Sequence, residues 1–324
     1  MSDFLLRRDF LKVSLAAVAA PGVAPQASSP AKPKPAPAIK PEAGADKLTT
    51  YQFGPQIWIR WANQLLTSYR AHPTQKYPYL YPVAGPVTGL SLTSESSVPF
   101  PHHRSLLFAC DHVNGANYWQ TEMKDGQVLS GGPKLGPATP TSAQILDQCQ
   151  WHKPGEPAVL TDQRKITVSV VSPRLRLIDA EIQWTAVQDV TVTKTNHSLF
   201  ALRAAPDIIP WGGGTLLNSA GLQGEKATFG KTAAWCGYYG RRQGVPGNVV
   251  EGIVLMDHPK NPWAPTPWFT RDYGFISPSP FNFIDKPWQL SKGQSVMLRY
   301  RVVLHAGDPQ EAEIAKIYRT WAAT

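Results

Sequence analysis

Apolar and polar residues alternate along much of the chain, most regularly in its middle. Ile166, Val168 and Val170 alternate with polar neighbours, and Leu175 and Leu177 alternate with arginines. Side chains two positions apart share one face of an extended strand. This spacing therefore predicts antiparallel strands, with the aliphatic side chains on a core and the arginines on the other face.

Two shorter patterns predict where neighbouring strands turn and where a sheet ends. Residues 57–61 and 65–69 are mostly apolar or aromatic, and they flank Asn63-Gln64, an arrangement typical of a β-hairpin. The segment 77–82 is rich in tyrosine but contains two prolines. Because proline lacks the N–H group that a central strand donates to its neighbour, this segment is expected at a sheet edge.

The end of the chain carries the one pattern that strongly favours a helix. Asp308, Pro309 and Glu311 suit the N-cap, first and third positions of a helix, and an apolar stripe follows at 314–321. Elsewhere the chain shows no regular alternation of strand and helix patterns. The sequence therefore predicts an all-β protein, an antiparallel sandwich with one C-terminal helix.

Composition supports this fold class and argues against two kinds of ligand, nucleic acid and a metal bound by thiolates. The 324 residues include 11 Trp, 11 Tyr and 11 Phe, with 31 Pro and 25 Gly, a profile typical of aromatic strands and frequent turns. The net charge of +9 is scattered, with no basic run interleaved with aromatic residues, which argues against a nucleic-acid partner. Cys110, Cys149 and Cys236 leave at least one thiol free and allow one disulfide, and their spacing does not fit a thiolate metal site.

The N-terminal residues predict export. Arg7-Arg8 precedes a short apolar run at 13–20, which resembles a twin-arginine signal and is too short to span a bilayer. We expect an export signal over residues 1–27, a linker rich in proline, alanine and lysine over 28–47, and a folded domain over 48–324. The protein is accordingly expected in the periplasm or outside the cell, with no integral membrane segment.

The stretch from residue 101 to 119 concentrates polar chemistry around an apolar run. If the whole stretch is extended, His102 shares a face with Arg104, and His103 points the other way. This arrangement indicates a strand that crosses the interior with functional groups at both ends. Its candidate side chains are His102, His103, Arg104, Asp111, Asn114 and Trp119.

Two later stretches, 257–262 and 268–274, again combine histidine, aspartate, arginine and aromatic side chains. A glycine-rich loop at 211–215 lacks the lysine of a phosphate-binding loop, so it is interpreted as a matter of backbone geometry only. The candidates after residue 190 are His197, Trp235, Asp257, His258, Trp268, Arg271, Asp272 and Tyr273.

Several of these motifs resemble a bacterial family catalogued as PmoA-like, or methane oxygenase PmoA. The matching stretches are 79–82, 102–119, 213–215, 257–259, 268–274 and 298–308. The name does not describe the chain, because no apolar run is long enough for a membrane subunit of a methane monooxygenase. The resemblance implies a galactose-mutarotase-like supersandwich. Proteins of that fold commonly bind sugars in a concave sheet through histidine, arginine, carboxylate and aromatic side chains.

The leading hypothesis is an exported carbohydrate-active enzyme, of the glycoside hydrolase, lyase or epimerase type, that uses His/Asp acid–base chemistry. Such chemistry needs a proton donor and an acceptor with separated pKa values. The expected catalytic residues are His102, His103, His258 and Asp272. The expected substrate-binding residues are Arg104, Asp111, Asn114, Trp119, His197, Trp235, Asp257, Trp268, Arg271 and Tyr273.

Each assignment has an alternative. His102 and His103 fit hydrogen-bonded loop residues, and Asn114-Gly115 fits a simple turn. Asp257-His258 fits a turn cap, Arg271-Asp272 fits a buried structural pair, and the tryptophans fit a core. A non-catalytic carbohydrate-binding module is the second hypothesis. A metal-dependent enzyme ranks third, because no His-x-His or His-Glu-x-x-His spacing occurs. No metal or other cofactor is therefore predicted. The leading hypothesis requires residues 102–104 and 268–273 to meet at one site.

Overall fold

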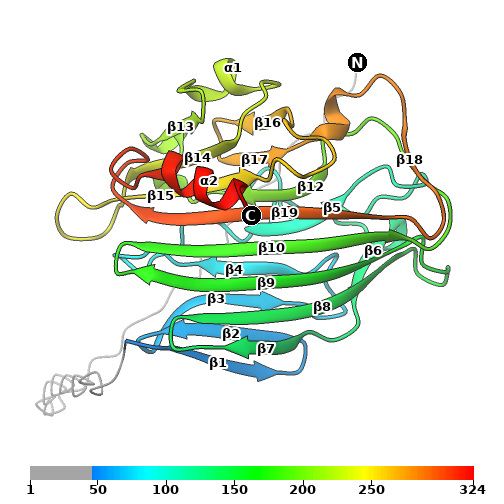
Figure 1. The fold of residues 1–324 in the computed structure, drawn as a ribbon, viewed down its shortest axis with the longest axis horizontal. Helices are drawn as coiled ribbons and strands as arrows, with labels where there is room; N and C mark the ends of the chain where they lie inside the picture. The colour runs from blue at the N-terminus through cyan, green and yellow to red at the C-terminus, as the bar shows by residue number, and fades with distance from the viewer. Residues whose placement is uncertain (1–45) are drawn as a thin grey trace, which may run out of the picture. The chain divides into compact units, whose positions relative to one another are not determined.

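Two antiparallel sheets contain most of the secondary structure in the computed structural model, which describes residues 46–324 (Figure 1). The predicted export signal and nearly all of the predicted linker lie outside these residues. The first sheet has eight strands. In spatial order they are β1 (Leu48–Phe53), β2 (Gln56–Trp61), β3 (Gln64–Arg70), β4 (Tyr79–Val83), β5 (Leu106–Cys110), β12 (Ser198–Arg203), β17 (Phe275–Pro278) and β16 (Trp268–Arg271).

The second sheet has nine strands. In spatial order they are β13 (Thr215–Asn218), β14 (Trp235–Arg241), β15 (Val250–Asp257), β19 (Ser295–Ala306), β10 (Leu175–Ala186), β9 (Leu160–Ser172), β8 (Ser142–His152) and β6 (Gln127–Ser130), and β7 (Lys134–Ala138) also pairs with β8. A separate ribbon joins β11 (Val190–Val192) and β18 (Trp288–Leu290). The helices are α1 (Gly224–Thr228), α2 (Ile314–Ala322) and the 3-10 turns η1 (Met123–Asp125), η2 (Pro206–Ile208), η3 (Pro210–Gly212) and η4 (Pro280–Phe283).

The two sheets pack face to face, and aromatic side chains fill the space between them. Phe200 of β12 stacks on Tyr300 of β19 with ring centroids 4.9 Å apart. Phe108 of β5 meets Trp151 and Trp184 of the second sheet at 5.8 and 6.2 Å. Figure 1 shows the long strands β8 to β10 with β2 to β4 of the first sheet behind them. These contacts confirm the predicted all-β antiparallel sandwich.

Strand β10 departs from the predicted orientation. Its buried face carries Arg176 and Trp184, whereas Leu175 and Leu177 lie half-buried on the opposite face. There the two leucines pack against a hydrophobic cluster that includes Trp321 of α2. Because this cluster shelters the outer face of the sheet, the leucines need not face the space between the sheets. The prediction that the arginines turn away from the core was wrong for Arg176.

The C-terminal helix is confirmed, but it begins later than its capping motif predicted. The carboxylate of Asp308 accepts hydrogen bonds of 2.8 Å from the N–H groups of Gln310 and Glu311, so it caps a single turn. Glu313 then adopts a left-handed backbone conformation with φ of 53°, and α2 starts at Ile314. Since helical residues have negative φ, Glu313 separates the capped turn from the helix.

The hairpin predicted around residue 63 is confirmed as β2 and β3. Ala62 and Asn63 form its turn, with φ of 48° and 60°. Positive φ at both central residues defines a type I′ turn, whose twist matches that of the paired strands. The turn therefore lies one residue earlier than the Asn63-Gln64 pair suggested.

The strand β4 was predicted at a sheet edge, and this prediction was wrong. β4 lies between β3 and β5 in the first sheet. It pairs with β5 only through Tyr79 and Leu80, and its pairing with β3 contains a register irregularity. Pro82 lies beyond the pairs with β5, so its missing N–H group removes no bond from that ladder.

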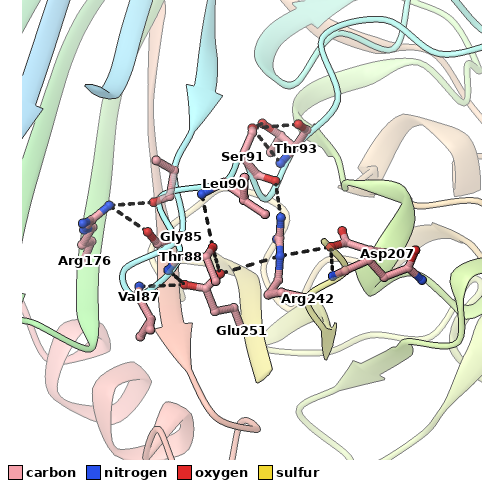
Figure 2. Close-up of polar contacts among 12 residues, drawn as sticks. Gly85, Val87, Thr88, Leu90, Ser91, Thr93, Arg176, Asp207, Arg242 and Glu251 are labelled. Carbon is pink, nitrogen blue, oxygen red and sulfur yellow. Dashed lines mark hydrogen bonds and ion pairs between the residues drawn. The ribbon is translucent and has the colours of Figure 1, made fainter. Parts of the chain in front are cut away.

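A buried ionic network ties the loop after β4 to the second sheet (Figure 2). Glu251 of β15 is fully buried and accepts hydrogen bonds of 2.7 and 3.1 Å from the N–H groups of Val87 and Thr88. The guanidinium of Arg242 lies 3.7 Å from the same carboxylate. Arg176 donates to two carbonyl oxygens of the loop at 3.0 Å each. The network therefore fixes the loop to β10 and β15.

Cys110, Cys149 and Cys236 are free and buried, so the disulfide that their number allowed does not form. Desolvation raises the pKa of each thiol well above its ordinary value, which makes them unreactive core residues. Within residues 46–324, no helix is both long and apolar enough to cross a membrane.

Candidate functional site

The residues that precede β5 form turns rather than an extended strand. The chain at 101–104 lies outside any strand, and β5 begins at Leu106. The rings of His102 and His103 contact each other with centroids 4.5 Å apart, and the hydroxyl of Tyr77 donates a hydrogen bond to the carbonyl of His102. The predicted alternation of the two histidines across a strand was therefore wrong, because both imidazoles lie together.

A third histidine joins these two from the start of β12. His197 directly precedes β12, which pairs with β5. Its ring centroid lies 5.3 Å from that of His102 and 6.1 Å from that of His103. One ring nitrogen from each residue lies within 4.8 Å of the others. We call His102, His103 and His197 the histidine cluster.

Asp111 supports the cluster from the end of β5. Its Oδ2 lies 3.5 Å from Nδ1 of His197, and its Oδ1 accepts a hydrogen bond of 2.6 Å from the N–H group of His112. Only 5% of Asp111 is exposed. A buried carboxylate beside an imidazole favours the tautomer that carries its proton on the facing nitrogen, so Asp111 orients His197.

Aromatic rings enclose the histidine cluster. Trp119 stacks on His197 with ring centroids 5.5 Å apart, and Phe275 of β17 stacks on His103 at 4.0 Å. Tyr273 lies nearly parallel to His103 at 6.1 Å. Tyr273 comes from the last of the predicted polar stretches. That stretch therefore reaches His103 through this one residue.

Burial keeps two of the imidazoles uncharged. Desolvation lowers the pKa of His102 to about 4, and the neighbouring His197 acts in the same direction. Desolvation also lowers the pKa of His103 to about 2, helped by His102, His197, Arg203 and Arg271. At neutral pH both rings are therefore poor proton donors. Their ring nitrogens remain available to accept hydrogen bonds or to bind a metal ion.

Arg203 lies at this site, and the sequence analysis missed it. It ends β12 with only 6% of its surface exposed, and its guanidinium lies 4.7 Å above the ring of Tyr273. Desolvation lowers the pKa of Arg203. Its Nε and Nη1 atoms have no hydrogen-bond partner among residues 46–324. The one signal in the sequence was a single arginine that interrupts the apolar run from 199 to 205.

Other residues of the site also have buried polar atoms without a partner. They are Nε2 of His102, Nδ1 of His103 and Nε1 of Trp119, within the part of the chain that the structure describes. Leaving a buried polar group unpaired costs about 1–3 kcal/mol. Native proteins therefore retain such groups mainly where a ligand, an ion or water satisfies them. This concentration makes the histidine cluster and its neighbours the candidate functional site.

Two predicted residues of the first stretch have structural partners instead. The guanidinium of Arg104 lies 5.3 Å above the ring of Tyr79 and donates to its hydroxyl at 3.3 Å. The side chain of Asn114 donates to the carbonyl of Asp189 and accepts from the N–H group of Thr191. Asn114 thus joins its turn to β11, and Arg104 packs on β4.

The other candidates near β16 contact α1 and the core. Arg271 lies 3.2 Å from the carboxylate of Glu225, and Asp272 accepts a hydrogen bond of 2.8 Å from the N–H group of Glu225. Trp268 is fully buried, and its Nε1 donates to the carbonyl of Ala233. These contacts are those of structural residues, and the structure brings only Tyr273 of this stretch against the histidines.

The candidates at β14 and the end of β15 lie on the second sheet, away from the histidine cluster. Asp257 accepts hydrogen bonds of 2.7 and 2.6 Å from Asn261 and Thr266, which shapes the turn after β15. The ring of His258 packs on Trp321 of α2 with centroids 4.7 Å apart. Trp235 belongs to the hydrophobic cluster that contains the same tryptophan. All three thus stabilise the packing of the second sheet.

Asp257 gives a testable pH dependence. Desolvation raises its pKa to about 6, although hydrogen bonds from Thr266 and Asn261 oppose the shift. Because the folded state then binds the proton more tightly than the unfolded chain, stability falls as the pH rises from about 4 through about 6. Between pH 4 and 7, wild type should lose roughly 2–3 kcal/mol of unfolding free energy relative to Asp257→Asn, measured by urea denaturation. A difference that stays constant across this range would contradict the assignment.

A cavity of about 760 Å³ lies elsewhere, against the second sheet, and none of the predicted site residues lines it. Its lining includes Gln148, Gln163, Gln183 and Met297, which are direct neighbours across β8, β9, β10 and β19. We call this set the glutamine groove. Its amide groups are exposed or half-exposed, so water can satisfy them. The groove therefore lacks the unpartnered buried atoms that mark the histidine cluster.

Comparison with protein families places the chain. Residues 43–319 match a family described as a family of unknown function, DUF6807. The chain belongs to this family. The description of this family assigns no activity. No protein of curated function matches the chain.

Two solved structures are similar to this member of the DUF6807 family. One is named as a kojibiose phosphorylase from the human microbiome, with 10% identity, a TM-score of 0.32, and coverage of 80% of this chain and 32% of that one. The other is a galactose mutarotase related enzyme from Lactobacillus acidophilus, with 8% identity, a TM-score of 0.29, and coverage of 80% and 97%. The chain thus spans about a third of the first structure's length. TM-scores this low carry no argument about the fold. The sandwich is therefore assigned from the strand order of this chain alone.

Proposed function

We propose that the protein is a carbohydrate-active enzyme whose substrate binds at the histidine cluster. The proposal is supported by the five buried nitrogen atoms of His102, His103, Trp119 and Arg203 that have no partner within residues 46–324. A polyhydroxylated ligand carries many donors and acceptors close together, so it can satisfy several such atoms at once. An apolar ligand would leave them unpaired at the same cost as in the free protein.

The surroundings of each side chain suggest its role. Asp111 and His197 are the candidate pair for proton transfer, because the carboxylate lies 3.5 Å from Nδ1 of the imidazole and orients the ring. The uncharged rings of His102 and His103 have nitrogen atoms free to hold the substrate, either by hydrogen bonds or through a bound ion. This assignment moves proton transfer away from the two histidines that the sequence favoured for it.

Arg203 supplies the positive charge. Its planar guanidinium suits a carboxylate, a sulfate or a developing oxyanion, which it can bind through two parallel hydrogen bonds. An acidic sugar, or a reaction that passes through an oxyanion, is therefore favoured over a neutral sugar held by hydroxyl contacts alone.

An aromatic surface lies beside this charge. Trp211 is 73% exposed and contacts Tyr273 with ring centroids 5.8 Å apart. An exposed tryptophan next to a polar site offers an apolar face on which the C–H groups of a sugar ring can pack. Trp211 comes from the glycine-rich loop, which the sequence analysis read as backbone geometry only.

A non-catalytic carbohydrate-binding module is the second candidate, and the glutamine groove favours it. Gln148, Gln163 and Gln183 lie directly opposite one another on neighbouring strands. Each amide offers donors and an acceptor to sugar hydroxyls. Binding in this groove would need neither the histidines nor Arg203.

A panel of neutral and acidic glycosides separates the two candidates. The full chain is incubated with each compound, and products are followed by mass spectrometry, with NMR for epimers of unchanged mass. The enzyme proposal predicts turnover of at least one compound, with acidic sugars preferred. Binding of a panel member without any product would instead support the binding module.

A further inference from the structure

We propose that the histidine cluster binds a divalent transition-metal ion, with one ring nitrogen from each of His102, His103 and His197 as ligands. In the metal-bound site His197 would serve as a ligand and not as a proton-transfer group. The part that the ion plays in catalysis rests on the proposed function. Its binding does not, because binding can be measured without substrate.

The geometry of the three rings suits such an ion. The candidate nitrogen atoms all lie within 4.8 Å of one another. In a tetrahedral zinc site with Zn–N distances near 2.0–2.1 Å, ligand nitrogens lie roughly 3.3 Å apart. Small rotations of the imidazoles would close this difference.

Two of the three rings present nitrogens that nothing else uses. Nε2 of His102 and Nδ1 of His103 are buried and have no hydrogen-bond partner among residues 46–324, and His103 is only 2% exposed. Metal ligation requires a neutral imidazole with a free lone pair. An ion held by these two atoms would therefore displace no protein group.

A carboxylate lies beside the third ring. Asp111 lies 3.5 Å from Nδ1 of His197, which leaves Nε2 of that ring for the ion. Histidine ligands commonly donate their other N–H group to a carboxylate, which fixes the ring and makes the ligating nitrogen more basic. The Asp111 carboxylate also offsets part of the ion's charge.

This ligand set points to a particular class of ion. Three imidazoles suit Zn²⁺ and its first-row neighbours better than Mg²⁺ or Ca²⁺, which prefer oxygen ligands. Three protein ligands leave a fourth position for water or a substrate oxygen, as in catalytic zinc sites. The Arg203 cation beside the cluster would favour an anionic group at that position. The site escapes a sequence search because its ligands come from two loops that lie far apart in the sequence, one before β5 and one before β12.

Cobalt titration of the full chain, freed of metal by chelation and shown to remain folded, tests the proposal. Co²⁺ should bind one ion per chain and develop visible absorption bands typical of nitrogen ligation, and Zn²⁺ should displace it. His102→Ala and His197→Ala should each weaken binding more than about 100-fold, and Asp111→Asn by about 10–100-fold. His72→Ala, which removes an exposed histidine, should leave binding unchanged.

Absence of Co²⁺ and Zn²⁺ binding to the folded wild type would overturn the proposal. So would equal affinity in wild type, His102→Ala and Asp111→Asn. Asp111→Asn keeps the size of the side chain. This variant therefore still tests metal binding if the alanine variants unfold. Turnover of a glycoside by protein that binds no metal would reject the ion and leave the enzyme proposal standing. Metal binding with no turnover across the panel would support the ion and reject the enzyme proposal.

Discussion

Replacing Arg203 with methionine should abolish most activity without destabilising the fold. We expect turnover to fall by about two to three orders of magnitude, the effect of removing a buried charged partner from a ligand. The unfolding free energy should stay the same or rise by up to about 2 kcal/mol, because methionine removes an unpaired buried cation and keeps its volume. Kinetics and urea denaturation of the same preparation give both values.

Arg164 provides the matched control, since it is equally buried but fully paired. Its Nε and Nη2 donate to the carboxylate of Asp162 at 2.7 and 2.9 Å. Arg164→Met leaves that carboxylate without its partner and should cost about 3–5 kcal/mol. If Arg203→Met destabilises the protein as much as Arg164→Met does, Arg203 is a structural residue.

Replacing Glu251 with alanine should destabilise the fold strongly. The fully buried carboxylate accepts two backbone hydrogen bonds from the loop after β4, and it lies beside Arg242 (Figure 2). Its removal leaves the N–H groups of Val87 and Thr88 without an acceptor and removes one of the two carboxylates beside the Arg242 guanidinium. Breaking a buried pair in this way costs about 3–5 kcal/mol, which urea denaturation would detect.

Glu181→Ala is the control for a surface glutamate. Glu181 pairs with Lys165, and both side chains are about two-fifths exposed, at 39% and 43%. Exposed pairs contribute about 0–1 kcal/mol, so this variant should remain close to wild type. Similar losses in Glu251→Ala and Glu181→Ala would show that the buried network does not hold the loop.

The strands could be predicted wherever only one face of a strand meets the core. Ile166, Val168 and Val170 of β9 point inward as their spacing indicated. The prediction failed at β10, where α2 and its hydrophobic cluster shelter the outer face and Arg176 is held inside by loop carbonyls. The local pattern of a strand does not show whether a helix from elsewhere in the chain covers its outer face.

The site could be predicted only in part, for a related reason. Composition singled out His102 and His103, but the pairing of β5 with β12 is what brings His197 and Arg203 to them. Residue type also could not separate Tyr273, which reaches the histidines, from Trp268 and Asp257, which are satisfied within the core or a turn. Pairing between strands far apart in the sequence decides which residues reach the histidine cluster and which do not. Local sequence patterns cannot predict this pairing.

The central claim is that the histidine cluster, and not the glutamine groove, is where a carbohydrate is processed. The most direct measurement compares turnover of a responsive glycoside by wild type, His197→Ala and Gln163→Ala, with unfolding midpoints recorded for each. We predict that His197→Ala loses at least about 100-fold in rate with a nearly unchanged midpoint, and that Gln163→Ala keeps wild-type activity. Full activity in folded His197→Ala, together with its loss in Gln163→Ala, would contradict the claim.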